Sequence, residues 1–224
     1  SAAFEAKGVK VSGEGFVAML AARFIEEGRF SLQDRVQKFI PELQKDFDAT
    51  IEDLLRYRVK GVRMSTLNFS TFEEVRAHAL EAGFDGPPGT SVYTNLPAFV
   101  LGIILERVGG AQIATLAHHE IFEPLGMHET TFFPAADRCA PTEIVAGEVI
   151  QGLPHDESAR ICARARRSVG HAGLFSNVDD LLTCAEYLIE HRDSAEVRAA
   201  QQGLGWEVAD ATRMGVHTRE GSFA

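Results

Sequence analysis

Apolar residues recur three or four positions apart along much of the chain, the spacing that places them on one face of an α-helix. The first such run extends from Phe16 to Gly28. Thr50 precedes another run and Asp53 follows three residues later, an arrangement typical of a capped helix start. The pattern predicts helices that start near Phe16, Ile51, Phe72, Pro97, Ala111 and Asp179.

Strand patterns are scarce by comparison. The candidates are residues 143–150, 206–209 and 213–218. We expect fewer than about a fifth of the residues in strands, somewhat below the usual ~20–25% of globular proteins. Residues 134–170 have few periodic runs and several glycines and prolines, which favours a long surface excursion. The pattern predicts one helix-rich domain over residues 1–224.

Composition limits the classes of partner. The sequence is 45% hydrophobic and 24% charged, ordinary values for a globular protein, and its formal net charge is −10. Such an acidic chain offers no basic stripe for nucleic-acid phosphates, so a nucleic-acid partner is not expected. The arginines between Arg160 and Arg167 are expected on a solvated face. The chain lacks an apolar run of roughly eighteen residues, so no transmembrane segment is predicted.

The three cysteines do not have the spacing of a zinc site. Cys139, Cys162 and Cys184 are expected as buried free thiols, and one disulfide with one free thiol is the alternative. The run of acidic and histidine residues at 155–157 is a weak metal candidate, because adjacent residues on a loop seldom converge on one ion. We therefore expect neither a metal nor a cofactor.

The segment at 87–95, Pro-Pro-Gly-Thr-Ser-Val-Tyr-Thr-Asn, is the most informative stretch. The turn that opens it is rigid, and Tyr93 and Asn95 then project from the same side of the backbone. A phenol and a carboxamide so placed can move a proton and hold an amide or ester carbonyl. The alternative is that Tyr93 covers the core while Asn95 caps the helix that follows.

Several further short segments follow one another along the chain and are informative together. They are Ile-Phe-Glu-Pro-Leu-Gly-Met at 121–127, His-Asp-Glu at 155–157, Gly-His-Ala-Gly-Leu-Phe-Ser at 170–176 and His-Thr at 217–218. Together with Tyr93-x-Asn95 they resemble the serine β-lactamase and penicillin-binding-protein superfamily, in its class C, esterase and D-aminopeptidase branch. The resemblance covers residues 16–218. It implies an α+β, transpeptidase-like fold of which this chain supplies mainly the helical lobe and few sheet strands, incomplete at both ends.

The first catalytic element of that superfamily, Ser-x-x-Lys, is missing from its expected place. The family spacing, counted back from Gly28, puts the serine at Val11 and the lysine at Glu14. Ser12 lies one residue off, but Gly15 follows it at the lysine position. Glu14 reverses the charge that the mechanism needs, because a serine hydroxyl is a weak nucleophile without a neighbouring base.

The third element, Lys/His-Thr-Gly, is altered. His217 and Thr218 match it, but Arg219 replaces the glycine that lets a substrate lie against the strand. The resemblance implies that Tyr93 and Asn95 are catalytic and that His217, Thr218 and Arg219 bind the substrate carboxylate. His217 could equally be an ordinary strand histidine, and His171 in the glycine-rich turn is expected to be structural.

The resemblance implies a serine hydrolase relative whose ligands are small molecules or peptides: D-amino-acid peptides, β-lactams or small esters. Because the first element is absent, we expect its acyl-enzyme chemistry to be impaired. Two alternatives stay open at this point. The chain could be a non-catalytic binding or regulatory protein that uses the retained cleft, or a fragment of an active hydrolase.

Overall fold

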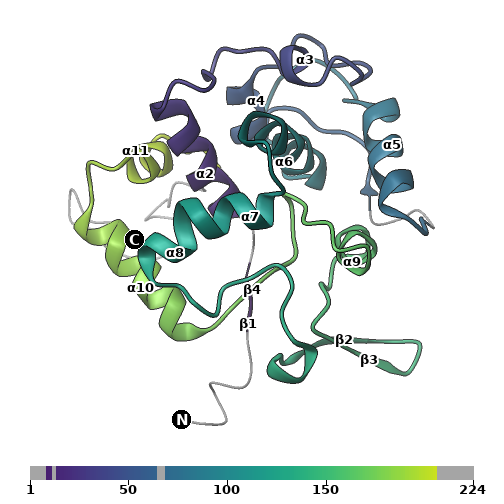
Figure 1. Cartoon of the computed structure of the whole chain (residues 1–224). Helices are drawn as coiled ribbons and strands as arrows, with labels where there is room; N and C mark the ends of the chain where they lie inside the picture. The colour runs from purple at the N-terminus through teal and green to yellow at the C-terminus, as the bar shows by residue number, and fades with distance from the viewer. Residues whose placement is uncertain (1–8, 12–13, 65–68, 206–224) are drawn as a thin grey trace.

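The structure, a computed structural model, describes residues 9–11, 14–64 and 69–205. Helices are its main regular structure, and they surround two central helices, α2 (Glu14–Glu26) and α6 (Asn95–Gly109) (Figure 1). Both central helices are apolar around most of their surface, and their buried side chains form the middle of the core. The helix-rich α+β prediction is confirmed.

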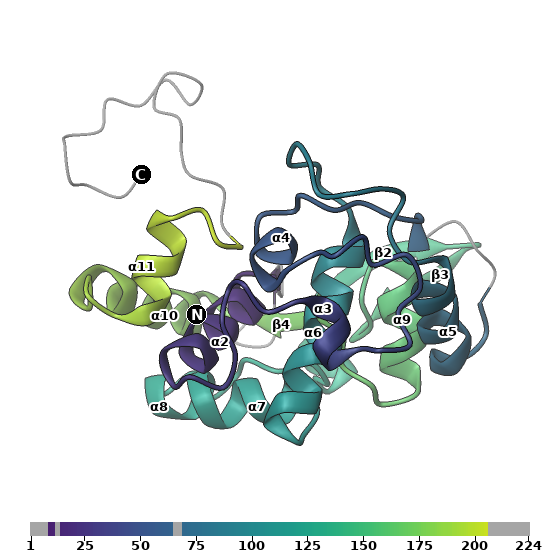
Figure 2. The ribbon, with the colours of Figure 1, turned by 90° about the horizontal axis from the view of Figure 1, so that it is seen from above.

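The remaining helices cover this pair. They are α3 (Val36–Phe39), α4 (Ile51–Leu55), α5 (Phe72–Ala82), α7 (Ile113–Ala117), α8 (Glu123–Leu125), α9 (Glu157–Arg164), α10 (Val178–Glu190) and α11 (Ala195–Gln201). A π-helical turn, η2 (His118–Phe122), joins α7 to α8, and a 3₁₀ turn, η3 (Ala136–Arg138), follows later. In both ribbon views α10 and α11 lie on the side of the molecule opposite α5 and α9 (Figures 1 and 2).

Two small antiparallel sheets complete the described part. β1 (Val9–Val11) pairs with β4 (Leu174–Ser176), which brings residues far apart in the sequence side by side. β2 (Pro141–Val145) pairs with β3 (Glu148–Gln151) in a hairpin that extends from the body of the molecule (Figure 1). Residues 143–150, read from the sequence as one strand, are thus two strands. The turn between them uses Ala146 and Gly147, both at positive φ, as two-residue hairpin loops require.

Local capping signals correctly located several helix ends. Thr50 and Asp53 form a complete capping box at α4, and Asn177 caps α10. α5 ends at Gly83 and α6 at Gly110, both at positive φ. Helices α9 and α11 were not predicted. They are short, and α9 lies in the 134–170 segment, where no long apolar period marks it.

The predicted helix from Ala111 to Phe122 is not a single α-helix. Pro124 explains the change, because its ring clashes with the carbonyl four residues earlier and it has no N–H to donate. The chain widens into the η2 turn, where the Glu123 N–H bonds to the His118 carbonyl. The Glu120 carbonyl, which Pro124 cannot satisfy, accepts a hydrogen bond from the Arg23 guanidinium.

Three further expectations have clear outcomes. All three cysteines are free and buried, as predicted. The expectation of a solvated arginine face is wrong for Arg160, which is buried and pairs with Glu143 of β2. No described helix is by itself long and apolar enough to cross a membrane; α6 and the segment Ile113–Leu125 together have such a length and composition, but they are bent by 72°.

Candidate active site

The Tyr-x-Asn loop is fastened to the end of α4 by hydrogen bonds. The Gly89 N–H, the Ser91 hydroxyl and the Val92 N–H donate to successive backbone carbonyls of residues 56–58, at 2.8–2.9 Å. These bonds hold the backbone directly before Tyr93. The sequence prediction of a rigid loop that presents this tyrosine is consistent with the arrangement.

Tyr93 contacts the first turn of α2. Its hydroxyl donates to Glu14 Oε1 at 2.7 Å, and its ring stacks on Tyr57 with centroids 5.4 Å apart. Tyr93 is 64% exposed, and partial desolvation, the hydrogen bond to Glu14 and the Glu14 charge together raise the pKa of its phenol. Burial and the Glu14 charge likewise raise the pKa of Tyr57. Both phenols therefore stay protonated at neutral pH.

This contact places Glu14 where the resemblance puts the catalytic lysine. β1 ends at Val11 and α2 begins at Glu14, three residues later. A carboxylate thus accepts a hydrogen bond from the tyrosine at the position where an ammonium group was expected. Ser12, the other residue considered for the first element, lies outside the described residues.

Asn95 does not cap the helix that it begins. Thr94 occupies the cap position, and the Asn95 amide instead donates to Asp156 Oδ2 at 2.8 Å. Asp156 comes from the start of α9, 61 residues away in sequence. The capping alternative for Asn95 is therefore wrong, and its side chain is directed by a tertiary contact.

Asp156 is the centre of a buried polar cluster. Its Oδ1 accepts from the Ala159 N–H and the Ser158 hydroxyl, at 2.8 and 2.7 Å, and lies 3.2 Å from His171 Nε2. Burial alone would raise the pKa of this carboxyl. The hydrogen bond and charge of His171, with the donors from Ala159 and Ser158, outweigh burial and hold the pKa well below its usual range.

The serine, histidine and aspartate of this cluster do not form a nucleophilic triad. The Ser158 hydroxyl donates a hydrogen bond to Asp156 and lies 3.0 Å from His171 Nε2, but Ser158 is fully buried and therefore cannot reach a substrate. The His171 side chain is also fully buried, and its Nδ1 has no hydrogen-bond partner within the described residues. The expectation that His171 is structural agrees with this position.

Close backbone packing holds Gly170, the residue before His171, against α6. A Cβ built on Gly170 would lie 2.2 Å from the Ala98 carbonyl oxygen of α6 and 3.2 Å from Gly102 Cα. Only a residue without a side chain allows this approach. The glycine-rich turn at 170–173 therefore seats the histidine against the first turns of α6.

The candidate metal residues at 155–157 diverge. His155 pairs with Glu143, at 3.1 Å between Nδ1 and Oε2; Asp156 belongs to the buried cluster; and Glu157 is exposed. The third element, His217, Thr218 and Arg219, lies outside the described residues, so its position relative to Tyr93 stays a prediction. Sequence reasoning named Asp156 only as part of the 155–157 segment and did not predict its contacts with Asn95 and His171.

Comparisons with known proteins identify the family and the fold. The family model described as Beta-lactamase matches residues 15–221. An Escherichia coli (strain K12) protein named "Putative D-alanyl-D-alanine carboxypeptidase" is 24% identical over 241 residues, which cover 83% of this chain and 54% of that protein. The chain thus spans about half the length of the curated relatives it matches.

Solved structures share the fold at low identity. The β-lactamase/D-alanine carboxypeptidase from Pseudomonas syringae superposes with a TM-score of 0.68 at 19% identity, over 86% of this chain and 55% of that one. The D-amino acid amidase from Ochrobactrum anthropi SV3 gives a TM-score of 0.66 at 19% identity, over 83% and 56%. These likenesses confirm the transpeptidase-like fold and its partial coverage. By its family model and its fold, the chain belongs to the beta-lactamase family.

Proposed function

We propose that this chain is a β-lactamase-like hydrolase relative whose acyl-enzyme chemistry is impaired and whose cleft still binds small D-amino-acid peptides. The hydrogen bond from the Tyr93 hydroxyl to Glu14 carries the proposal. Acyl transfer requires a group that takes the proton of the attacking hydroxyl. A tyrosine whose hydroxyl already donates to a carboxylate, which also raises its pKa, is poorly suited to that task.

The nucleophile position supports the same conclusion. The residue three positions before Glu14 is Val11, whose side chain has no atom that can attack a carbonyl. Ser158 donates a hydrogen bond to Asp156, the residue that also accepts from Asn95. Ser158 is fully buried and therefore inaccessible to a substrate. The described residues around Tyr93 and Asn95 therefore favour binding over acylation.

The ligand class is inferred from chemistry and from the relatives. Asn95 carries a carboxamide that can both donate to and accept from an amide. His217 and Arg219, if they lie beside the Tyr-x-Asn loop, would supply donors for a carboxylate, and arginine can bind it in a bidentate fork. The relatives include a putative D-alanyl-D-alanine carboxypeptidase, whose named substrate group carries an amide and a carboxylate, and a D-amino acid amidase.

Two measurements test the proposal. A fluorescent penicillin or a fluorophosphonate should not label the purified chain. Calorimetric titration with a D-Ala-D-Ala peptide should show binding that Arg219→Ala weakens by roughly 1.5–3 kcal/mol, the range for hydrogen bonds to charged groups. Tyr93→Phe should weaken it less. Arg164→Ala, which removes an exposed arginine from the end of α9, is the matched control and should leave the affinity unchanged.

Each half of the proposal can fail separately. Stoichiometric labelling, placed by mass spectrometry on a serine beside Tyr93, would show that the acyl-enzyme chemistry is intact. If the Arg219→Ala variant binds the peptide with unchanged affinity, the third element does not contribute to the binding site. Its match to the family would then reflect the shared fold alone.

A further inference from the structure

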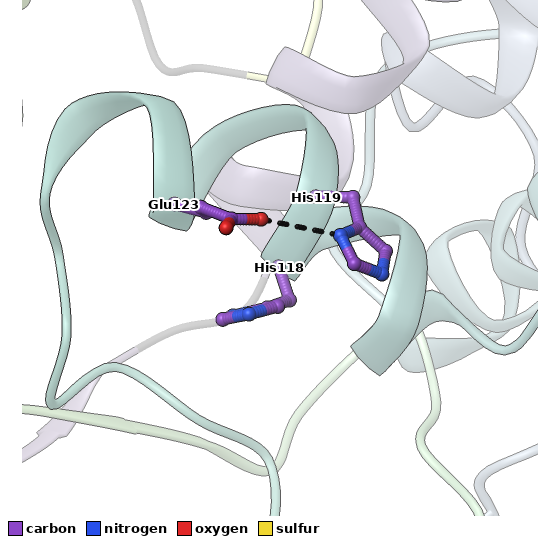
Figure 3. Close-up of side chains that lie close together, drawn as sticks. All are labelled: His118, His119 and Glu123. Atoms are coloured by element: carbon purple, nitrogen blue, oxygen red, sulfur yellow. Dashed lines mark hydrogen bonds and ion pairs between the residues drawn. The ribbon is translucent and has the colours of Figure 1, made fainter.

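Three potential metal ligands gather on the surface of the η2 turn. His118, His119 and Glu123 each offer a ligand atom, and these atoms all lie within 4.8 Å of one another. His119 Nδ1 and Glu123 Oε2 are 3.3 Å apart, and all three residues are exposed. Figure 3 shows the Glu123 carboxylate directed at the His119 ring, with the His118 ring beside them.

The π-helical backbone brings these residues together. In an α-helix, with 3.6 residues per turn, His118 and Glu123 would lie roughly 140° apart around the axis. The η2 turn bonds the Glu123 N–H to the His118 carbonyl, five residues back, and so places the two side chains on one face. The hydrogen bond from Arg23 to the Glu120 carbonyl accompanies this wider turn. The cluster therefore results from fixed backbone geometry.

Two imidazoles and a carboxylate form a donor set suited to zinc and related transition-metal cations. Zinc–nitrogen and zinc–oxygen bonds of about 2.0–2.2 Å place tetrahedral ligand atoms roughly 3.4 Å apart. The His119–Glu123 separation already meets that value. The longer separations can close by side-chain rotation, because solvent surrounds all three groups.

The neighbouring groups leave this set available. Glu120, the other carboxylate of the turn, lies 3.8 Å from Arg29 and is half-buried. A shallow depression of about 350 Å³, lined in part by His118, His119 and Thr115, opens beside the turn. A fourth coordination position would therefore face solvent and take water.

We propose that His118, His119 and Glu123 bind a divalent transition-metal cation, with Zn²⁺ the best match to the donor set. The site lies on the α7–η2–α8 segment, and it involves neither Tyr93 nor Asn95. Its success or failure is thus independent of the proposed peptide binding. An ion bound there would cross-link the side chains of the η2 turn. It would stabilise the folded chain, because the unfolded chain lacks the assembled site.

Titration of the metal-free chain with Zn²⁺ tests the proposal. Calorimetry should give one ion per chain, and H118A and E123Q should each weaken binding at least tenfold. H155A is the matched control: His155 also pairs with a glutamate, at 3.1 Å, but the pair is not part of a three-ligand group among the described residues. Its affinity for Zn²⁺ should equal that of the unchanged chain.

A spectroscopic measurement supplies an independent check. Co²⁺ in place of Zn²⁺ should give the intense visible absorption of four-coordinate cobalt, and H118A should abolish it. Circular dichroism should show that the variants are folded, since all three side chains are exposed. The proposal is overturned if H118A and E123Q bind Zn²⁺ as tightly as the unchanged chain, or if H155A loses binding as they do.

Discussion

The Asp156 cluster gives the sharpest prediction about stability. Asp156→Ala removes the acceptor shared by Asn95, Ser158 and His171, and also the side-chain cap of α9. The carboxylate has only 16% of its side-chain surface exposed, so water can replace few of these bonds. The remaining donors would be left in a largely buried space.

The magnitude follows from these contacts. Loss of a helix N-cap costs about 1 kcal/mol. Each largely buried donor left without its acceptor, from Asn95 and Ser158, costs roughly 1–3 kcal/mol. The terms overlap, and we expect Asp156→Ala to lower the free energy of unfolding by roughly 3–5 kcal/mol. A domain near the middle of the usual range of about 5–15 kcal/mol would still fold after this loss.

Urea unfolding followed by far-UV circular dichroism measures the loss. Glu157→Ala is the matched control, since it removes the adjacent exposed carboxylate from the same helix start and should cost at most about 0.3–1 kcal/mol. A double-mutant cycle of Asp156→Ala with Asn95→Ala should give a coupling of roughly 1.5–3 kcal/mol. A loss for Asp156→Ala no greater than that of the control, with no coupling, would refute this account of the cluster.

Two further predictions concern packing and pH. Gly170→Ala should cost roughly 1–3 kcal/mol or more, because its Cβ would lie 2.2 Å from the Ala98 carbonyl oxygen, whereas Gly86→Ala, with no atom within 4 Å of its Cβ, should change the urea midpoint little. The folded-state pKa of Asp156 is depressed, and the Arg107 hydrogen bond lowers that of Glu42 to about 2. Stability should therefore be fully present above the unfolded pKa values of about 3.9–4.3 and be lost as pH falls below them. In the Asp156→Ala variant, the urea midpoint should fall less steeply with decreasing pH than in the unchanged chain. An equal slope would contradict the attribution of this pH dependence to Asp156.

Sequence alone determined the features that depend on neighbouring residues. The capping box of Thr50 and Asp53 and the helix end at Gly83 involve groups within one turn, so their identities suffice to place them. The same is true of the missing Ser-x-x-Lys, since Val11 and Glu14 are read directly from the chain. The family resemblance rested on segments of this local kind.

Other features required the tertiary structure. From sequence, Asn95 was equally suitable as a helix cap and as an active-site residue. Only its packing against α9 directs its amide to Asp156. Arg160 looked solvated because other arginines follow it closely in sequence, but it is buried and pairs with Glu143 of β2. Neither partner could be chosen from a single sequence, because each contact depends on how distant segments fold together.

The two polar groups of residues on which the proposals rest show the same contrast. Their residues can be read from the sequence, but their proximity depends on the fold. Glu14 and Tyr93 were each identified from sequence, but their hydrogen bond joins residues 79 positions apart and exists because the loop is fastened to α4. His118 and Glu123 are close in sequence, yet an α-helix would separate them around its axis. Pro124 forbids the regular helix, and the resulting π turn brings the two side chains together.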